Sequence, residues 1–106
     1  MSDALVIFCA CPDDGVAAAL ARRLVDERLA ACVNRWPLTA STYRWDGHVV
    51  DEPEVMLMIK TTPDRYPALA ARLVELLPYE VPEVIALPVE HGHPAYLRWL
   101  GAETSG

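Results

Sequence analysis

The sequence predicts an α+β fold of the ferredoxin-like, split βαβ type. The first observation is a run of five apolar residues, Val55–Ile59, which is apolar on both faces of an extended chain and therefore indicates a strand in the middle of a covered sheet. The second is the predicted order of elements: strand, helix, strand, strand, helix, strand. Right-handed crossovers then place the first strand beside Val55–Ile59, with both helices on one face of the sheet.

The first strand and the first helix are predicted from residues 4–29. Residues 4–11 (Ala-Leu-Val-Ile-Phe-Cys-Ala-Cys) are apolar on both faces and indicate a buried strand. The segment Pro-Asp-Asp-Gly at 12–15 ends this strand and offers a helix N-cap. Apolar residues then recur at near-helical spacing with charged residues between them, which predicts an amphipathic helix; they are Val16, Leu20, Leu24 and Leu29.

A hairpin is predicted next. Residues 30–36 form a strand that resumes at 41–45 after Pro37, and Asp46-Gly47 is a two-residue turn signal. The chain returns through 48–51 into the central strand.

The last third of the chain predicts a helix, a strand and a closing helix. Thr62 is the expected N-cap of a helix over 63–77, with Pro63 at its first position and Pro78 at its end. Residues 84–87 form the last strand and 94–100 a short helix, and we expect 104–106 to be a frayed tail.

Composition limits the class of protein. The length of 106 residues predicts one domain, residues 1–106. A net charge of −6 argues against nucleic-acid binding, which depends on neutralising phosphates. No apolar run approaches the ~20 residues of a membrane span, so no membrane partner is expected. The N-terminus has Asp3 and no basic segment that would indicate a signal peptide, so we expect a cytoplasmic protein with reduced cysteines.

The predicted fold leaves apolar surface uncovered. Both central strands are apolar on the face away from the helices, and only the short C-terminal helix remains to cover it. The ribbon from Val49 to Thr62 is 14 residues long. Fully extended, it would span roughly 46 Å and overhang a domain of this size. We therefore expect a homo-oligomer that buries this face and the hairpin; the alternative is that Pro37 and Pro53 bend the ribbon back onto its own domain.

Five segments resemble the CutA divalent-cation tolerance family in order and spacing, and together they cover roughly Leu5 to Leu100. They are Leu29-Ala30-Ala31-Cys32, Tyr43-Arg44-Trp45-Asp46-Gly47, Ile59-Lys60-Thr61-Thr62, Pro78-Tyr79-Glu80-Val81-Pro82-Glu83-Val84 and Tyr96-Leu97-Arg98-Trp99-Leu100. The resemblance implies a ferredoxin-like fold and a homotrimer whose hairpins reach across neighbouring subunits. It also implies a cytoplasmic protein that responds to copper or other divalent metal ions, similar in architecture to the PII signalling proteins.

The resemblance implies a copper site built from two cysteines and a histidine. Cys9 and Cys32 match the two cysteine positions, but Leu76 and Leu77 stand where the histidine would lie. Cys11 leaves the same strand face as Cys9 and is the candidate replacement, because thiolates favour soft metals such as Cu(I). The alternative is that each cysteine packs as a small apolar residue.

A second candidate site is a polar ligand pocket formed by Lys60, Tyr79, Glu80 and Glu83. Lys60 interrupts the apolar central strand at its C-terminal end, and the other three precede the last strand. The alternative is a structural ion pair that satisfies Lys60.

No motif of a known enzyme class is present, so we expect a protein that is not an enzyme. The leading hypothesis is a trimeric metal-ion tolerance protein. The alternatives are a PII-like regulatory module that binds a small anionic metabolite near Lys60, and a purely structural assembly protein.

Overall fold

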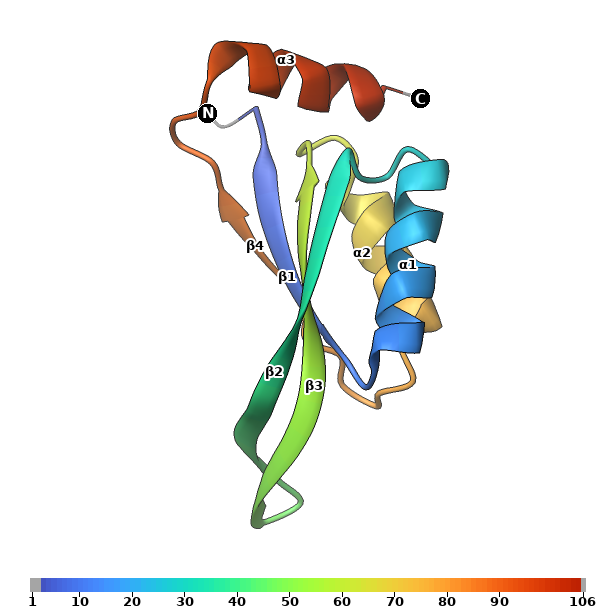
Figure 1. Cartoon of the computed structure of the whole chain (residues 1–106), viewed down its shortest axis with the longest axis vertical. Coiled ribbons are helices and arrows are strands. Elements are labelled where there is room, and N and C mark those ends of the chain that lie inside the picture. The colour runs from blue at the N-terminus through green and yellow to red at the C-terminus, as the bar shows by residue number, and fades with distance from the viewer. Residues whose placement is uncertain (1–2, 106) are drawn as a thin grey trace.

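The computed structural model describes residues 3–105, and its order of elements is the predicted one, including the closing helix (Figure 1). The elements are β1 (Leu5–Cys11), α1 (Asp14–Asp26), β2 (Cys32–Trp45), β3 (His48–Thr61), α2 (Tyr66–Leu76), β4 (Ile85–Pro88) and α3 (Pro94–Glu103). The predicted α+β fold is therefore confirmed. Among these described residues no helix is long and apolar enough to cross a lipid bilayer.

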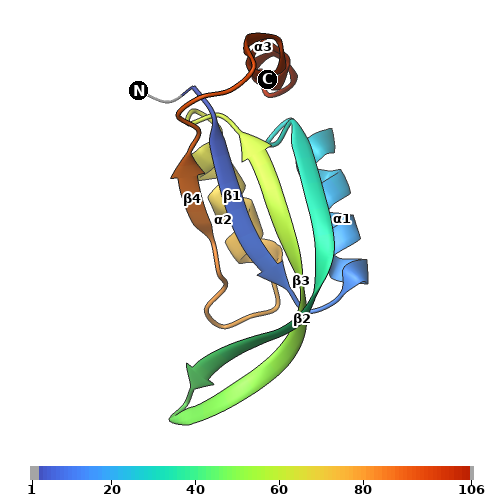
Figure 2. The same cartoon turned by 60° about the vertical axis from the view of Figure 1, so that its left-hand side comes forward.

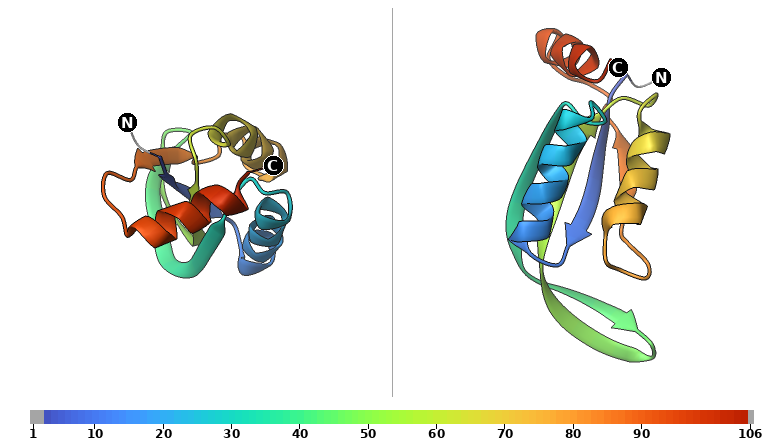
Figure 3. Two further views of the ribbon diagram at one scale, coloured as in Figure 1. Left: turned by 90° about the horizontal axis from the view of Figure 1, so that it is seen from above. Right: turned by 90° about the vertical axis from the view of Figure 1, so that its right-hand side faces the viewer.

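The four strands form one antiparallel sheet in the order β2-β3-β1-β4. The predicted central pair is confirmed, because β1 pairs with β3 from Leu5↔Thr61 to Cys11↔Val55. Helices α1 and α2 lie side by side on one face of this sheet (Figure 2). The right-hand view of Figure 3 looks onto the helix layer, with α1 and α2 upright in front of the strands.

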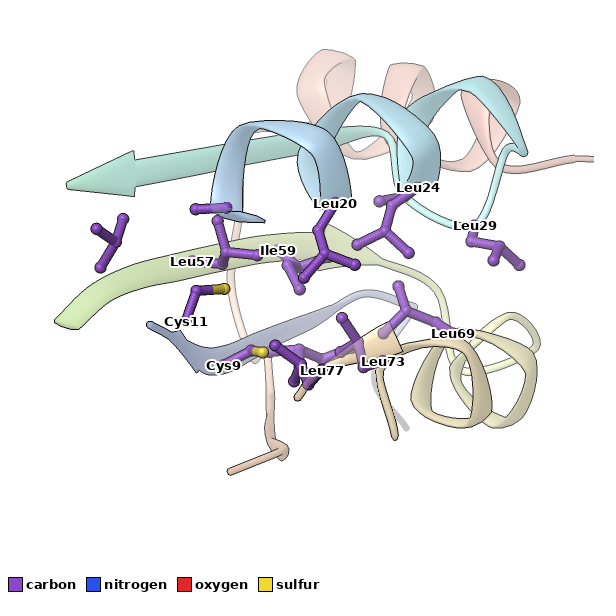
Figure 4. Close-up of a cluster of buried hydrophobic side chains, with 14 residues drawn as sticks. Cys9, Cys11, Leu20, Leu24, Leu29, Leu57, Ile59, Leu69, Leu73 and Leu77 are labelled. Atoms are coloured by element: carbon purple, nitrogen blue, oxygen red, sulfur yellow. The ribbon is translucent and has the colours of Figure 1, made fainter. Parts of the chain in front are cut away.

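The core lies between this face and the two helices (Figure 4). Alternate residues of β3 point into it, and Leu57 and Ile59 are completely buried. Leu24 of α1 and Leu73 of α2 meet them from the helix layer and are equally buried. Burying one such side chain contributes about 1.5–3 kcal/mol, so this layer supplies much of the stability.

The hairpin of β2 and β3 closes with a two-residue turn, as predicted. Trp45 pairs with His48, and the residues between them have left-handed backbone angles: φ is 52° at Asp46 and 83° at Gly47. The hairpin extends past the helices and gives the molecule dimensions of 45 × 25 × 22 Å (Figure 1). Each arm is one strand of 14 residues, with an irregularity in β2 between Leu38 and Ser41.

Two predicted features at the helix ends are wrong. Helix α2 begins at Tyr66, and neither Thr62 nor any other side chain caps it. Residues 62–66 instead form a tight turn, in which the amide of Arg65 donates to the carbonyl of Thr62 at 3.1 Å. The expected frayed tail is also wrong at Thr104, which is buried and accepts a 2.6 Å hydrogen bond from Arg65 Nε. Gly106 lies outside the described residues.

No helix of the described chain covers the second face of the sheet. Helix α3 lies across the end of the strands, as the view from above in Figure 3 shows. There Leu100 packs against Ala4 and Ala31 in a small separate cluster. The exposed fractions of Ile85 and Leu87, which lie on the uncovered face, are 54% and 52%.

Candidate functional site

Cys9 and Cys11 lie on the core face of β1, as their spacing predicted. Both side chains have an exposed fraction of 0% and belong to the cluster beneath the helices (Figure 4). The register explains their common direction, because Cys9 pairs with Leu57 and Cys11 with Val55, which are core residues of β3. The two thiols are therefore neighbours inside a closely packed layer.

The two thiols influence each other's ionisation. Hydrogen bonding from the Cys9 thiol lowers the pKa of Cys11. The pKa of Cys9 is raised, first by this same hydrogen bond and then by burial. The two pKa values are therefore shifted in opposite directions, so Cys11 loses its proton more readily than Cys9. A soft metal ion bound between Cys9 and Cys11 would meet two sulfur ligands.

Cys32 lies on the opposite face of the sheet from Cys9 and Cys11. It pairs with Lys60, whose neighbours Ile59 and Thr61 point into the core, so Lys60 and Cys32 point away from it. The expected metal site of Cys9, Cys32 and Cys11 is therefore not formed within one chain. The physical reason is the strand register, since residues one position apart leave opposite faces.

Lys60 and Cys32 form a small polar group at the open end of the sheet. The Lys60 ammonium donates a hydrogen bond to Asn34 Oδ1 and lies 4.0 Å from Cys32 Sγ. Tyr96 of α3 lies near the Cys32 thiol. Burial is the larger cause of the raised pKa of Tyr96, and the Cys32 thiol is the second cause. Among the described residues no carboxylate forms an ion pair with Lys60, so the predicted structural ion pair is not present in this chain.

The other three members of the predicted polar pocket do come together. Tyr79, Glu80 and Glu83 line a cavity of about 500 Å³ between the hairpin and the loop that precedes β4. The remaining lining residues come from β1, the hairpin and that loop: Ala10, Ser41, Thr42, Tyr43, Trp45, Glu54, Pro78 and Val81. Lys60 is not among them, because it lies six residues from Glu54 along β3, roughly 20 Å away.

Glu54 is the lining residue that sequence reasoning missed. Its carboxylate accepts a 2.5 Å hydrogen bond from the Tyr79 hydroxyl, which joins the loop to the middle of β3. The pKa of Tyr79 is raised, mainly by burial and secondly by this hydrogen bond, so the phenol stays protonated. Strand direction was the available signal: β4 runs antiparallel to β1, so the loop before β4 lies near the end of β1, which pairs with Val55 in the middle of β3.

The histidines do not complete a metal site. His48, His91 and His93 are all exposed, and His48 lies beside the hairpin turn. Among residues 3–105 no three histidine, cysteine or acidic side chains are close enough together to hold a metal ion. The thiol pair is thus the candidate metal ligand set of a single chain.

Comparison with protein families gives a match over residues 5–103 to the model described as CutA1 divalent ion tolerance protein. The chain is 46% identical over 99 residues to the divalent-cation tolerance protein CutA of Thermus thermophilus, covering 93% of this chain and 96% of that protein. It is 50% identical over 93 residues to mouse protein CutA, and there it spans only 52% of the relative's length.

Solved structures agree with the sequence comparison. The CutA crystal structure from Xylella fastidiosa superposes with a TM-score of 0.95 at 45% identity, covering 98% of this chain and all of that one (100%). A structure from Archaeoglobus fulgidus, described as a periplasmic divalent cation tolerance protein CutA, has a TM-score of 0.93 at 26% identity, with coverage of 96% and 99%. The likeness therefore extends over the whole described fold.

Proposed function

The chain belongs to the CutA1 divalent ion tolerance protein family, and we propose that it binds copper or another divalent metal ion and acts in the response to metal ions. It is a homologue of the divalent-cation tolerance protein CutA, and the family is not enzymatic. The observation that carries the proposal is the family match over residues 5–103.

The buried pair of Cys9 and Cys11 supplies the metal ligands in this proposal. Two sulfur donors suit a soft ion such as Cu(I), which needs few ligands, better than a hard ion that requires several oxygens. The neighbouring Cys9 thiol lowers the pKa of Cys11, which favours the deprotonated sulfur that metal binding requires. Cys32 belongs to this site only if a neighbouring subunit brings it to the pair.

An anaerobic Cu(I) titration against a competing chelator tests the proposal. The reduced protein should bind one ion per chain, and Cys9→Ala and Cys11→Ala should each abolish tight binding. Cys32→Ala is the matched control and should bind normally, because Cys32 lies on the other face. Denaturant unfolding of each variant separates lost ligands from lost structure. No binding by the unmodified protein contradicts the proposal, and loss in Cys32→Ala points to a site shared between subunits.

We propose further that the protein is a homotrimer. The apolar face left uncovered by the helices supports assembly, because Ile85, Leu87 and Trp36 (38% exposed) lie there. The hairpin that projects from the body supports it as well, since an isolated hairpin is marginally stable in water. Native mass spectrometry reports the subunit number directly, and a monomer at micromolar concentration contradicts this proposal.

A cytoplasmic location is part of the proposal. The three free cysteines Cys9, Cys11 and Cys32 support a reducing compartment. The similar structure from Archaeoglobus fulgidus is described as periplasmic, so the compartment is open to test. Cell fractionation with an antibody to the protein decides between the two.

A PII-like regulatory module is the second candidate function, and the environment of Lys60 favours it. The ammonium is half-buried, bound to the neutral Asn34 and not neutralised by a carboxylate of the described chain. It can therefore attract a small anionic metabolite. Thermal shifts with a panel of nucleotides and dicarboxylates test this, since a ligand that prefers the native state raises the melting temperature. Lys60→Met should remove the shift, and a shift that survives this substitution contradicts the assignment.

A further inference from the structure

The cavity between the hairpin and the loop before β4 has the size of a small-molecule site. Its volume of about 500 Å³ falls within the roughly 300–1,000 Å³ of known ligand pockets. Figure 2 shows the hairpin curving below that loop. Three separate parts of the chain form its walls, namely β1, the hairpin and the loop, so the cavity depends on the folded structure.

The charge of this cavity is negative. Glu54, Glu80 and Glu83 contribute carboxylates, and no lysine, arginine or histidine is among the lining residues, all of which belong to the described chain. The hydrogen bond from Tyr79 holds the Glu54 carboxylate against the wall. Carboxylates gathered around a concave surface focus the potential and attract cations.

Aromatic and aliphatic side chains form the rest of the wall. Tyr43 and Trp45 have exposed fractions of 40% and 44%, and both line the cavity from β2. An ammonium group over an aromatic face is attracted by the negative potential of the ring. Ala10, Pro78 and Val81 add apolar surface that suits a hydrocarbon chain.

We propose that this cavity binds an aliphatic diamine or polyamine. Such a ligand carries two or more ammonium groups for the three carboxylates and a methylene chain for the aromatic and aliphatic wall. A bare divalent ion fits less well, because no three acidic, cysteine or histidine side chains of residues 3–105 come close enough to coordinate one. The proposal is independent of the thiol pair and extends the function beyond metal ions.

Isothermal titration of the intact, assembled protein with spermidine tests the proposal. Glu80→Gln and Glu83→Gln remove one charge each from the cavity while keeping the side-chain shape, and both positions are exposed, so folding should be preserved. Each should weaken binding about two- to fivefold, as expected for one exposed ion pair. Glu90→Gln removes the same charge outside the cavity and should leave the affinity unchanged.

Three results overturn the proposal. Equal weakening by Glu90→Gln means that spermidine responds only to the net charge of −6. Displacement of spermidine by equimolar Mg²⁺ or Zn²⁺ means that the cavity is a metal site. No binding at all by the assembled protein means that a neighbouring copy fills the cavity.

Discussion

Cys9 and Cys32 lie on opposite faces of the same sheet, with Cys9 beneath the helices and Cys32 beside Lys60 on the uncovered side. The family resemblance pairs these two cysteines in one copper site. Within a single chain the two sulfurs cannot bind the same metal ion, because they leave opposite faces of the sheet and β3 lies between their strands. The extra thiol, Cys11, is the sulfur that the fold does bring to Cys9.

The buried layer between sheet and helices should dominate stability. We expect Leu57→Ala to lower the free energy of unfolding by about 2–5 kcal/mol, because Leu57 is fully buried and the truncation leaves a cavity. Val74→Ala on the outer side of α2, where the side chain is 56% exposed, should change it by less than about 0.5 kcal/mol. Urea unfolding measures both, and similar effects would contradict this location of the core.

The cap of α1 offers a second prediction. The Asp13 carboxylate accepts a 2.8 Å hydrogen bond from the amide of Val16. Asp13→Ala should lower the free energy of unfolding by about 0.5–2 kcal/mol, whereas Asp13→Asn, which keeps the acceptor, should have little effect. Equal losses in the two variants would mean that the charge matters and the cap does not.

The hairpin turn gives a prediction with a matched glycine control. Gly47→Ala should destabilise the protein by about 1 kcal/mol, because φ is 83° there and a side chain strains that conformation. Gly101→Ala in α3 meets nothing within 4 Å and should be neutral or stabilising by up to about 1 kcal/mol. Denaturant titration compares the two, and opposite signs are the expected outcome.

The ion pairs of Glu27 predict a pH dependence. Hydrogen bonds from Arg23 and Arg72 lower the pKa of Glu27 below its ordinary value of 4.5, and the 2.8 Å bond to Arg72 joins α1 to α2. Because the folded pKa is the lower one, the contribution is full above pH 4.5 and is lost as the pH falls through the folded pKa. Melting temperatures from about pH 7 to about pH 3 should therefore fall less steeply for Glu27→Gln than for the unmodified protein. If the melting temperatures of the two proteins fell equally steeply with pH, the ionisation of Glu27 would not contribute to stability.

A charge placed on the uncovered face of the sheet should prevent the proposed assembly. Leu87→Glu places a charge on that face and should shift the protein from trimer to monomer, since a buried unpaired carboxylate opposes association. Val74→Glu adds the same charge on the helix exterior and should leave the assembly intact. Light scattering after gel filtration distinguishes these outcomes, and a trimeric Leu87→Glu variant would place the interface elsewhere.

The sequence predicted the elements because the local signals agreed with the final packing. Val55–Ile59 is apolar on both faces and became half of the central pair, and Asp46-Gly47 formed the turn it predicts. The start of α2 was predicted too early because two prolines, Pro63 and Pro67, are both candidates for the first turn of the helix. Pro67, not Pro63, lies in the first turn of the helix.

The sites were harder to predict, because they depend on register and direction. Whether Cys32 shares a face with Cys9 is decided by a one-residue choice of register that composition does not reveal. Lys60 was grouped with Glu80, but Lys60 lies near the end of β3 whereas the loop that carries Glu80 lies beside Glu54, in the middle of that strand. The direction of β1 relative to β3, implied by the predicted topology, already separates them.

The pairing order of the sheet also constrains how the chain can fold during synthesis. β2 and β3 are joined by a two-residue turn, so their contact is local and can form within microseconds once both have emerged. β1 is made first, yet its two partners are β3 and β4, and β4 ends at Pro88. One side of this apolar strand therefore stays unpaired until β4 has also been made.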